Sequence, residues 1–306
     1  MIADGYPQPP RRITPLQPAR FAGGELAFPL TDAGIIALVQ DALDEDAADR
    51  DVTTLATVVA GHRARARLVA RANGVVCGVP LALAAFRLLD PDVSIRVDAE
   101  DGTAVRAGGD VLFLSGRARG LLTAERTALN FMQRLSGIAT LTRQYVQAVA
   151  GTGATIMDTR KTTPLWRALE KYAVRCGGGT NHRFSLEDAV LVKDNHLAVA
   201  GGDVAEAVRR VRAFADPRTP VQVECDTVAQ VRAAVAAGAT SVLLDNMTPD
   251  QLRESVAIAR GHCATEASGG VTLASVAAIA ATGVDRISVG ALTHSAPALN
   301  LALDFE

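Results

Sequence analysis

VQVECDTVAQVRAAVAAGATSVLLD, residues 221–245, is the stretch that decides the fold. It opens with an apolar run at 221–225 and closes with another at 241–245, and each run has the length of a short buried strand. Between them, Thr227 and Gln230 have the spacing of a capping box, and Gly238 stands where a helix commonly ends. The stretch therefore predicts a strand, a helix and a strand in succession, which is the repeating unit of a parallel sheet.

The same unit recurs through the second half of the chain. Further helices are predicted to start after Thr248 and after Thr272. A chain that alternates short strands with amphipathic helices builds a parallel sheet that closes toward a barrel. Since a complete barrel has eight strands, we expect an open or incomplete one, or a seventh strand that the pattern does not reveal. The six predicted strands are 154–158, 189–193, 221–225, 241–245, 263–268 and 286–290.

The first part of the chain has a different pattern. Residues 1–29 contain six of the 13 prolines, which predicts a flexible lead-in. Thr31 can cap the helix that follows. Residues 62–116 alternate apolar and polar side chains and break at glycine and aspartate, which is typical of a mostly antiparallel sheet, with a helix expected between its strands. A long helix is expected after a cap at Thr123, with its inward face formed by Leu129, Met132 and Leu135.

The composition excludes several classes of protein. The chain has 306 residues, 49% of them hydrophobic, and a formal net charge of only -2, so we expect no general attraction to nucleic acid or to an anionic membrane. No apolar run is long enough to cross a bilayer, and no signal peptide is recognisable. The four cysteines form no CxxC pair, so we expect reduced thiols in a cytoplasmic protein, and no zinc site.

The chemistry-bearing residues stand at the ends of the predicted strands. In (β/α) barrels the active site lies at the carboxyl ends of the strands, so these residues should face one mouth. In chain order the ends carry Asp158, Thr159, Arg160 and Lys161, then Lys193, Asp194, Asn195 and His196, then Glu224, then Asp245 and Asn246, then Ser268, Gly269 and Gly270, and finally Gly290. His196 is equally explained by a bond to a nearby backbone group.

Positive charge is concentrated in this set. His182 and Arg183 follow the triple glycine at 177–179 and join the strand-end cations Arg160, Lys161 and Lys193. Cations that are buried together repel one another unless anions are present, so such a cluster in a nearly neutral protein indicates a ligand with several negative charges.

Two further features fit a phosphorylated ligand. The glycine-bearing turns after the last two strands, at 268–270 and at Gly290, are typical of the phosphate pocket of barrel enzymes. Glu224 and Asp245 could hold ribose hydroxyls or a hydrated Mg²⁺, or could simply pair with a nearby cation.

Arg126 breaks a local rule. It is expected in the first turn of the helix capped at Thr123, where the helix dipole disfavours a cation by roughly 0.3–1 kcal/mol. Residues that break local rules often mark functional positions, so we expect a functional role for Arg126.

Eight motifs, in this order, resemble the quinolinate phosphoribosyltransferase family, the nicotinate-nucleotide pyrophosphorylases of NAD biosynthesis. The resemblance covers residues 31–306 and includes DALDEDAADRDVTTLATV near the start. The eight motifs are LLTAERTALNFMQRLSGIAT, DTRKTTP, LEKYAVRCGGGTNHR, LVKDNH, VECDT, LLDNM, ASGGV and ISVGALTHS.

The resemblance implies an α/β fold of two domains. Residues 30–136 should form an N-terminal α/β sandwich, and residues 137–295 an open, incomplete parallel (β/α) barrel of the type II phosphoribosyltransferase kind. Residues 296–306 should return to the first domain. Family members form homodimers or larger homo-oligomers in which the partner's N-terminal domain covers each barrel mouth, so Arg126 should complete the neighbour's site.

The resemblance also implies a reaction. A phosphoribosyl group passes from phosphoribosyl pyrophosphate to quinolinate with decarboxylation, giving nicotinate mononucleotide, CO₂ and pyrophosphate in de novo NAD biosynthesis, with Mg²⁺ as cofactor. The implied catalytic residues are Lys161, Lys193, Glu224 and Asp245, and the two acids are also the candidate metal ligands. The implied substrate-binding residues are these four with Arg126, Thr159, Arg160, His182, Arg183, Ser268, Gly269, Gly270, Gly290 and His294.

The chain departs from the family pattern at a few positions. Leu165 and Trp166 follow TTP where the family usually has Gly-Leu, while Ser185 and Arg50 each stand where it usually has Gly. Trp166 could alter the loop beside the site, but every charged motif residue is present.

Three other functions remain open. A class I aldolase would use Lys193 as a Schiff-base nucleophile. A binder of phosphorylated metabolites would perform no chemistry on the same scaffold. A pyrophosphorylase could also take another aromatic acid, although nicotinate, with one carboxylate, would not need so many cations.

Overall fold

The structure is a computed structural model that describes residues 19–21 and 24–306, so most of the proline-rich lead-in predicted over 1–29 lies outside the described residues. The chain divides into two compact units. Unit 1 comprises Met1–Thr140 with Pro297–Glu306, and unit 2 comprises Leu141–Ala296. The sequence placed the boundary at 136/137.

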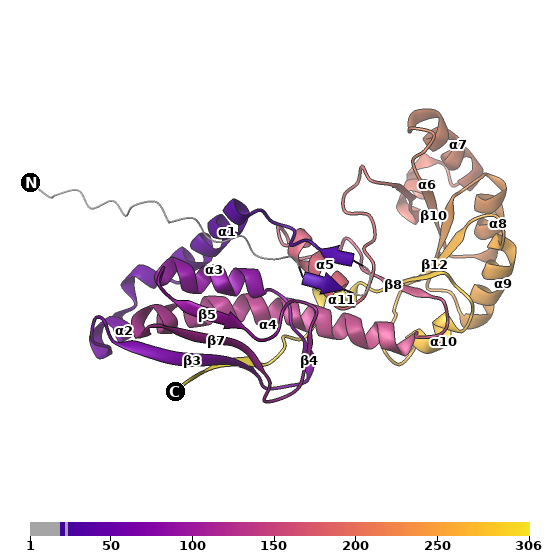
Figure 1. Ribbon diagram of the computed structural model, residues 1–306. Coiled ribbons are helices and arrows are strands. Elements are labelled where there is room, and N and C mark those ends of the chain that lie inside the picture. The colour runs from indigo at the N-terminus through magenta and orange to yellow at the C-terminus, as the bar shows by residue number, and fades with distance from the viewer. Residues whose placement is uncertain (1–18, 22–23) are drawn as a thin grey trace, which may run out of the picture. The chain divides into compact units, whose positions relative to one another are not determined.

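Unit 1 is built on a four-stranded antiparallel sheet with the order β14-β3-β7-β5. In Figure 1 helices α1 and α3 lie on the same side of this sheet. The strands are β3 (Arg63–Ala70), β5 (Ser94–Val97), β7 (Asp110–Arg117) and β14 (Leu301–Phe305), and β14 pairs with β3 from Leu301↔Ala70 to Phe305↔Ala66. The other elements are β1 (Ala19–Phe21), β2 (Gly24–Leu26), α1 (Asp32–Glu45), η1 (Ala48–Arg50), α2 (Val52–Thr57), β4 (Gly74–Val75), α3 (Val79–Leu89) and β6 (Ala104–Val105).

The sheet of unit 1 follows the alternation expected from its sequence. Along β3, Ala66 and Leu68 are buried while Arg65 and Arg67 are exposed, because successive side chains of a strand point to opposite faces. The predicted cap of α1 is confirmed, since the Thr31 hydroxyl accepts a hydrogen bond from the Gly34 amide at 3.2 Å. The antiparallel sheet over 62–116 and the helix within it are also confirmed.

The long helix α4 (Ala118–Ala148) begins earlier than predicted. Its first amide, at Ala118, donates to the His62 carbonyl at 2.8 Å directly after β7 ends, so the chain needs no cap at Thr123. The Thr123 hydroxyl instead donates to Asp51 Oδ2 at 2.9 Å, and Asp51 caps α2. Arg126 therefore lies in the helix interior, and the expectation that it sits in a first turn was wrong. Leu129, Met132 and Leu135 are buried, as predicted.

Unit 2 is a six-stranded parallel sheet with the order β8-β13-β12-β11-β10-β9. Figure 1 shows α6, α7, α8 and α9 following one another along the outside of the strands. The strands are β8 (Thr155–Met157), β9 (Val190–Val192), β10 (Val221–Cys225), β11 (Ser241–Asp245), β12 (Ala264–Ser268) and β13 (Arg286–Ser288). The helices are α5 (Arg167–Cys176), α6 (Asp194–Ala200), α7 (Val204–Phe214), α8 (Val228–Ala236), α9 (Pro249–Ala259), α10 (Val276–Ala280) and α11 (Ala291–His294).

The sheet of unit 2 is an open barrel. All six predicted strands form, no seventh joins them among the described residues, and β8 and β9 remain as the two edges. The capping boxes predicted at Thr227 and Thr248 are present. The helix expected after Thr272 starts only at Val276, because Thr272 and Ser275 first exchange hydrogen bonds in a turn. Since all strands are parallel, their carboxyl ends lie along one edge of the sheet.

Over residues 19–21 and 24–306, no helix combines the length and the apolar character that a membrane span requires.

Candidate active site

A cavity of about 740 Å³ opens at the carboxyl ends of the strands of unit 2. Its lining includes every substrate-binding residue that the family resemblance implied except Arg126, which belongs to unit 1. The structure thus brings together Thr159, Arg160, Lys161, His182, Arg183, Lys193, Glu224, Asp245, Ser268, Gly269, Gly270, Gly290 and His294. Asp158, Asp194, Asn195 and His196 do not line it. The Nδ1 atom of His196 accepts from the Lys193 amide at 2.9 Å, which is the plain explanation for that histidine.

Asp158, directly after β8, organises the loop that carries two of the lining residues. It is fully buried, forms an ion pair with the buried Lys171 of α5, and accepts from the His182 amide at 2.9 Å. The Lys171 ammonium also donates to the His182 carbonyl at 3.0 Å. A buried charge is tolerated only when it is paired, so this pair holds 182–183 at the mouth. The sequence placed Asp158 among the strand-end groups but did not indicate Lys171.

Arg160 and Arg183 are the half-buried cations of the cavity. Burial lowers the pKa of the Arg183 guanidinium, and the neighbouring charge of Arg160 lowers it further. Arg183 Nη1 donates to the Ala189 carbonyl at 2.9 Å, and the buried Nε of Arg160 has no hydrogen-bond partner among the residues that the structure describes. Two like charges that share a partly buried space are stabilised by an anion, and a guanidinium suits the flat fork of a carboxylate.

Lys193 and Glu224 form an ion pair in the lining of the cavity. Lys193 Nζ lies 2.9 Å from Glu224 Oε2, with the lysine side chain 45% and the glutamate 10% exposed. The sequence had left open that Glu224 simply pairs with a nearby cation, and it does so here, but both groups also line the cavity. Lys193 stands at the start of α6, immediately after β9, and Glu224 is the fourth residue of β10.

The glycine turns leave room beside polar groups. Gly269 has φ +90°, and a Cβ there would overlap the amide of Asn246, which itself adopts φ +54° after β11. At Gly290 a Cβ would lie 3.1 Å from His294 Nε2 and 3.3 Å from Lys161 Cδ. Side chains at these two positions would narrow the cavity, as expected for turns that let a phosphate approach the backbone closely.

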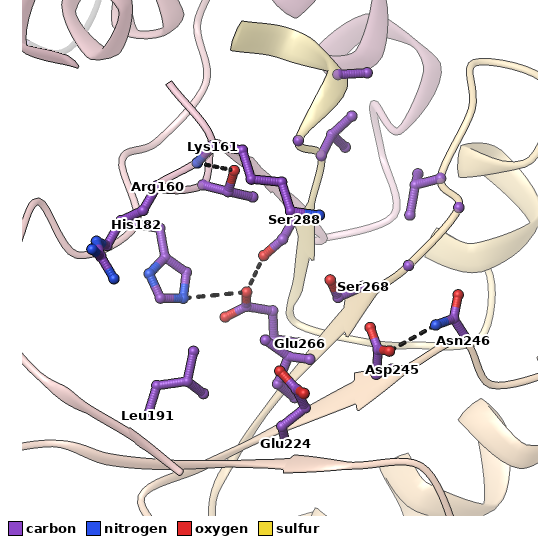
Figure 2. Close-up of a pocket in the computed structure, with 18 of the residues that line it drawn as sticks. Arg160, Lys161, His182, Leu191, Glu224, Asp245, Asn246, Glu266, Ser268 and Ser288 are labelled. Atoms are coloured by element: carbon purple, nitrogen blue, oxygen red, sulfur yellow. Dashed lines mark hydrogen bonds and ion pairs between the residues drawn. The ribbon is translucent and has the colours of Figure 1, made fainter. Parts of the chain in front are cut away.

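The Glu266 carboxylate, which lies at the floor of the cavity, was not identified from the sequence. Glu266 of β12 is 1% exposed and lines the cavity. The Ser288 hydroxyl donates to its Oε1, and His182 Nε2 lies 3.4 Å from the same oxygen (Figure 2). Gln222 Nε2 donates to Oε2 at 2.8 Å. A signal for it exists: side chains two residues apart in a strand share a face, so the residue two before each strand-end group also points inward. This spacing relates Gln222 to Glu224, Glu266 to Ser268 and Ser288 to Gly290.

The two acids at the strand ends fit a magnesium ion held mainly through substrate phosphate. Among the described residues no group of three or more His, Cys, Asp or Glu side chains could hold a metal by itself. Mg²⁺ commonly takes one or two protein carboxylates and completes its shell with water and phosphate oxygens. Glu224 and Asp245 line the cavity and can supply such carboxylates, with Asp245 Oδ2 already accepting from the Asn246 amide at 2.7 Å.

An open parallel α/β barrel whose strand-end cavity is lined by two arginines and two lysines is typical of barrel enzymes that act on anionic, phosphorylated small molecules. Comparison with known families makes this specific. Residues 51–136 match the model of the quinolinate phosphoribosyl transferase N-terminal domain, and residues 138–304 match that of the C-terminal domain. The chain therefore belongs to the quinolinate phosphoribosyltransferase family.

Individual relatives agree with this assignment. The nicotinate-nucleotide pyrophosphorylase (carboxylating) of Mycobacterium leprae is 47% identical over 259 residues, which cover 83% of this chain and 90% of that one. The quinolinate phosphoribosyltransferase (decarboxylating) 1b of Nicotiana tabacum is 40% identical over 288 residues, covering 88% and 81%. The solved nicotinate-nucleotide pyrophosphorylase of Francisella tularensis superposes with a TM-score of 0.84 at 38% identity, covering 90% and 98%.

Proposed function

We propose that this chain is a quinolinate phosphoribosyltransferase of de novo NAD biosynthesis. It transfers the phosphoribosyl group of phosphoribosyl pyrophosphate to quinolinate, and the products are nicotinate mononucleotide, CO₂ and pyrophosphate. The observation that carries the proposal is the charge of the cavity, in which Arg160, Lys161, Arg183 and Lys193 gather around about 740 Å³. Quinolinate brings two carboxylates and its co-substrate brings a phosphate and a pyrophosphate, so the anions and cations match.

The first step is a displacement at the anomeric carbon. The pyridine nitrogen bonds to C1 of the ribose while the bond from C1 to the pyrophosphate oxygen breaks, and the electron pair leaves with pyrophosphate. The transition state has oxocarbenium character, as in glycoside cleavage. Lys161 and Lys193 stabilise the negative charge on the leaving group, and Glu224 and Asp245 stabilise the positive charge on the ribose. When bound, Mg²⁺ would neutralise part of the phosphate charge.

The second step is the loss of CO₂. Once the nitrogen carries the ribose it is cationic, so the bond between C2 and its carboxyl carbon can break with the electron pair remaining on C2. The adjacent positive nitrogen stabilises that pair until C2 takes up a proton. Arg160 and Arg183 hold the carboxylates in place during both steps, and positioning of this kind contributes a large part of many rate enhancements.

The neighbouring subunit completes the site in this proposal. Arg126 is exposed on α4 of unit 1, and the only acid within ion-pair distance of it among the described residues is Glu125 at 3.9 Å. We therefore propose a homodimer or a larger homo-oligomer in which Arg126 of one chain reaches the quinolinate of the next. Such symmetric exchange is typical of two-fold interfaces.

The aldolase alternative is less consistent with the geometry. A Schiff-base lysine must be free to attack a carbonyl carbon, whereas Lys193 Nζ is held by Glu224 Oε2 at 2.9 Å. Treatment with borohydride and a carbonyl substrate should leave no covalent adduct on Lys193.

The test of the function is a two-product assay. The purified chain is incubated with Mg²⁺, quinolinate and phosphoribosyl pyrophosphate, and CO₂ and pyrophosphate are measured together. We expect both in equal amounts from quinolinate, and neither above background when nicotinate replaces it. Pyrophosphate release with nicotinate alone would assign the chain to another aromatic acid, and release of neither product with quinolinate would contradict the proposal.

A further inference from the structure

The His182 ring has a defined hydrogen-bond partner at each nitrogen. Nδ1 accepts from the Arg183 amide at 2.8 Å. A ring nitrogen that accepts carries no proton, so the single proton of His182 is on Nε2. That nitrogen lies 3.2 Å from Gln222 Oε1 and 3.4 Å from Glu266 Oε1, both of which accept. These contacts match the ring form that carries a proton on Nε2 and none on Nδ1, although the place of His182 among arginines and lysines made it look like a further cation.

Glu266 is the group that fixes this arrangement. Burial alone would raise the pKa of Glu266, but the hydrogen bond and electrostatic interaction with His182, together with the hydrogen bonds from Ser288 and Gln222, outweigh burial and hold that pKa below its usual range. An ionised carboxylate only accepts hydrogen bonds, so every group that faces it must donate. The Gln222 amide is oriented as a result: its nitrogen donates to Glu266 at 2.8 Å, and its oxygen faces His182 Nε2.

We infer that Glu266 and His182 are positioning residues for Arg183. Glu266 holds His182 in the Nε2-protonated form (Figure 2). His182 Nδ1 in turn holds the Arg183 amide, so that the guanidinium is fixed at the mouth of the cavity. This inference rests on the proposed function, in which Arg183 binds a quinolinate carboxylate.

The anchoring matters because Arg183 lies beside another cation. Burial and the charge of Arg160 both act against the charged form of Arg183, and the segment that carries it runs between the two edge strands of the open barrel. Within the described part of the chain, only the Ala189 carbonyl accepts a hydrogen bond from the Arg183 guanidinium, at 2.9 Å. Without the hydrogen bonds among Glu266, Gln222 and His182, Arg183 would move away from Arg160. The two guanidinium groups would then no longer be placed to bind the same carboxylate.

The first experiment separates a neutral acceptor from a cation at position 182. His182→Asn keeps an acceptor near the Nδ1 position, His182→Gln keeps a donor near Nε2, and His182→Lys keeps a positive charge. Dissociation constants for quinolinate and for phosphoribosyl pyrophosphate are measured separately by calorimetry on the full chain. We expect His182→Asn to stay within about threefold of wild type for quinolinate, and the Gln and Lys variants to weaken it about tenfold or more. A lysine variant that binds better than the asparagine variant would overturn the inference.

The second experiment tests the hydrogen bonds among His182, Glu266 and Gln222 in the absence of ligand. In ¹⁵N-histidine-labelled wild-type chain, the nitrogen shifts of His182 should report the Nε2-protonated form. In Glu266→Gln, either the new amide nitrogen faces His182 Nε2 directly, or it faces Gln222, whose side chain then flips and turns its own nitrogen toward His182. Both cases place an N–H donor against His182 Nε2. The His182 nitrogen shifts should therefore change, and the quinolinate dissociation constant should rise about tenfold. Affinity for phosphoribosyl pyrophosphate should change less than about threefold.

The matched control is Thr265→Val on the same strand. Thr265 is buried, bonds Asp285 at 2.7 Å, and does not line the cavity, so its loss should lower stability but leave the His182 shifts and the quinolinate affinity unchanged. A doubly protonated or Nδ1-protonated His182 in the wild-type chain would overturn the inference, as would a Glu266→Gln variant that matches wild type. Failure of the proposed function gives a different result, because wild-type chain would not bind quinolinate while the shifts still reported the network.

Discussion

Single residues show which signals a sequence carries at a site and which it lacks. The strand-end rule located Lys193, Glu224 and Asp245 because apolar runs end visibly in charged groups. It could not show that His182 Nδ1 accepts from the Arg183 amide, since hydrogen-bond direction depends on the packed neighbours. Glu266 was hidden because it lies inside a strand, where its partners Gln222 and Ser288 come from two other strands.

Replacing Arg183 by alanine tests the carboxylate contact. We expect quinolinate affinity to fall about tenfold to a hundredfold, as for loss of a charge-assisted hydrogen bond, while the free energy of unfolding changes by less than about 1 kcal/mol. Binding is measured by calorimetry and stability by urea unfolding. Arg175→Ala, an exposed residue on α5, is the matched control and should change neither quantity. Unchanged binding in Arg183→Ala would remove the assignment.

Leu165, one of the departures from the family pattern, is strained. It is fully exposed and has φ +67°, a left-handed conformation that costs a residue with a Cβ roughly 1–2 kcal/mol. Glycine adopts it freely but loses more chain entropy on folding, so Leu165→Gly should raise the free energy of unfolding by up to about 1 kcal/mol. Leu186→Gly, at an exposed leucine without positive φ, should lower it by about 0.5–1 kcal/mol. Urea denaturation checks both, and a change of the same sign in the two variants would contradict the strain.

Elements were predictable where their ends carry local signals. The capping boxes at Thr227 and Thr248 fixed two helix starts, and the period-2 alternation fixed the antiparallel sheet. The start of α4 was missed because it is set by tertiary contacts. Its first amide donates a hydrogen bond to the His62 carbonyl, and the Thr123 hydroxyl donates to Asp51, the N-cap of α2. A threonine that resembles a cap in sequence can therefore be a side-chain donor inside a helix.

The cap of α2 predicts a pH dependence. Hydrogen bonds from the Thr54 hydroxyl and amide, with a smaller one from Thr123, hold the pKa of Asp51 below its usual range. A depressed carboxyl pKa stabilises the fold above the unfolded-state value of about 3.9, and this contribution is lost as pH falls through the lower folded value. Asp51→Asn keeps an acceptor but no charge, so the acid-induced fall in unfolding free energy should become shallower below about pH 4.

The check on Asp51 is urea unfolding between neutral pH and about pH 2.5. Asp41→Asn removes an exposed carboxylate from α1 and serves as the control, with the wild-type slope expected. An Asp51→Asn slope equal to that of wild type would show that the pKa of Asp51 does not differ between the folded and the unfolded state, which would contradict the prediction.

At the scale of the whole molecule, the sequence predicted an open parallel barrel and an antiparallel α/β domain, and the fold has both. The order of the six strands in space was not readable, because pairing between distant strands depends on how helices pack over them. The oligomer, the cytoplasmic location and the bound Mg²⁺ remain predictions, since each depends on something outside one chain.

Mixing two inactive variants tests the shared site. Arg126→Ala keeps its own cavity, and Lys193→Ala keeps its Arg126, so a mixed dimer would regain one complete site. After unfolding and refolding together in equal amounts, random pairing should restore about one quarter of the wild-type sites, measured as CO₂ release. As a control, Arg126→Ala mixed with the variant that carries both Arg126→Ala and Lys193→Ala should stay inactive. If the first mixture also stays inactive, Arg126 does not act across subunits.

The pairing of β14 with β3 has a consequence for how the molecule is made. The strand that completes the sheet of unit 1 is translated only after the whole barrel, so a nascent chain on the ribosome carries an unfinished sheet with a bare edge beside β3. Until synthesis ends, that edge is open to pairing with other chains, and charged arginines along β3 would discourage such encounters.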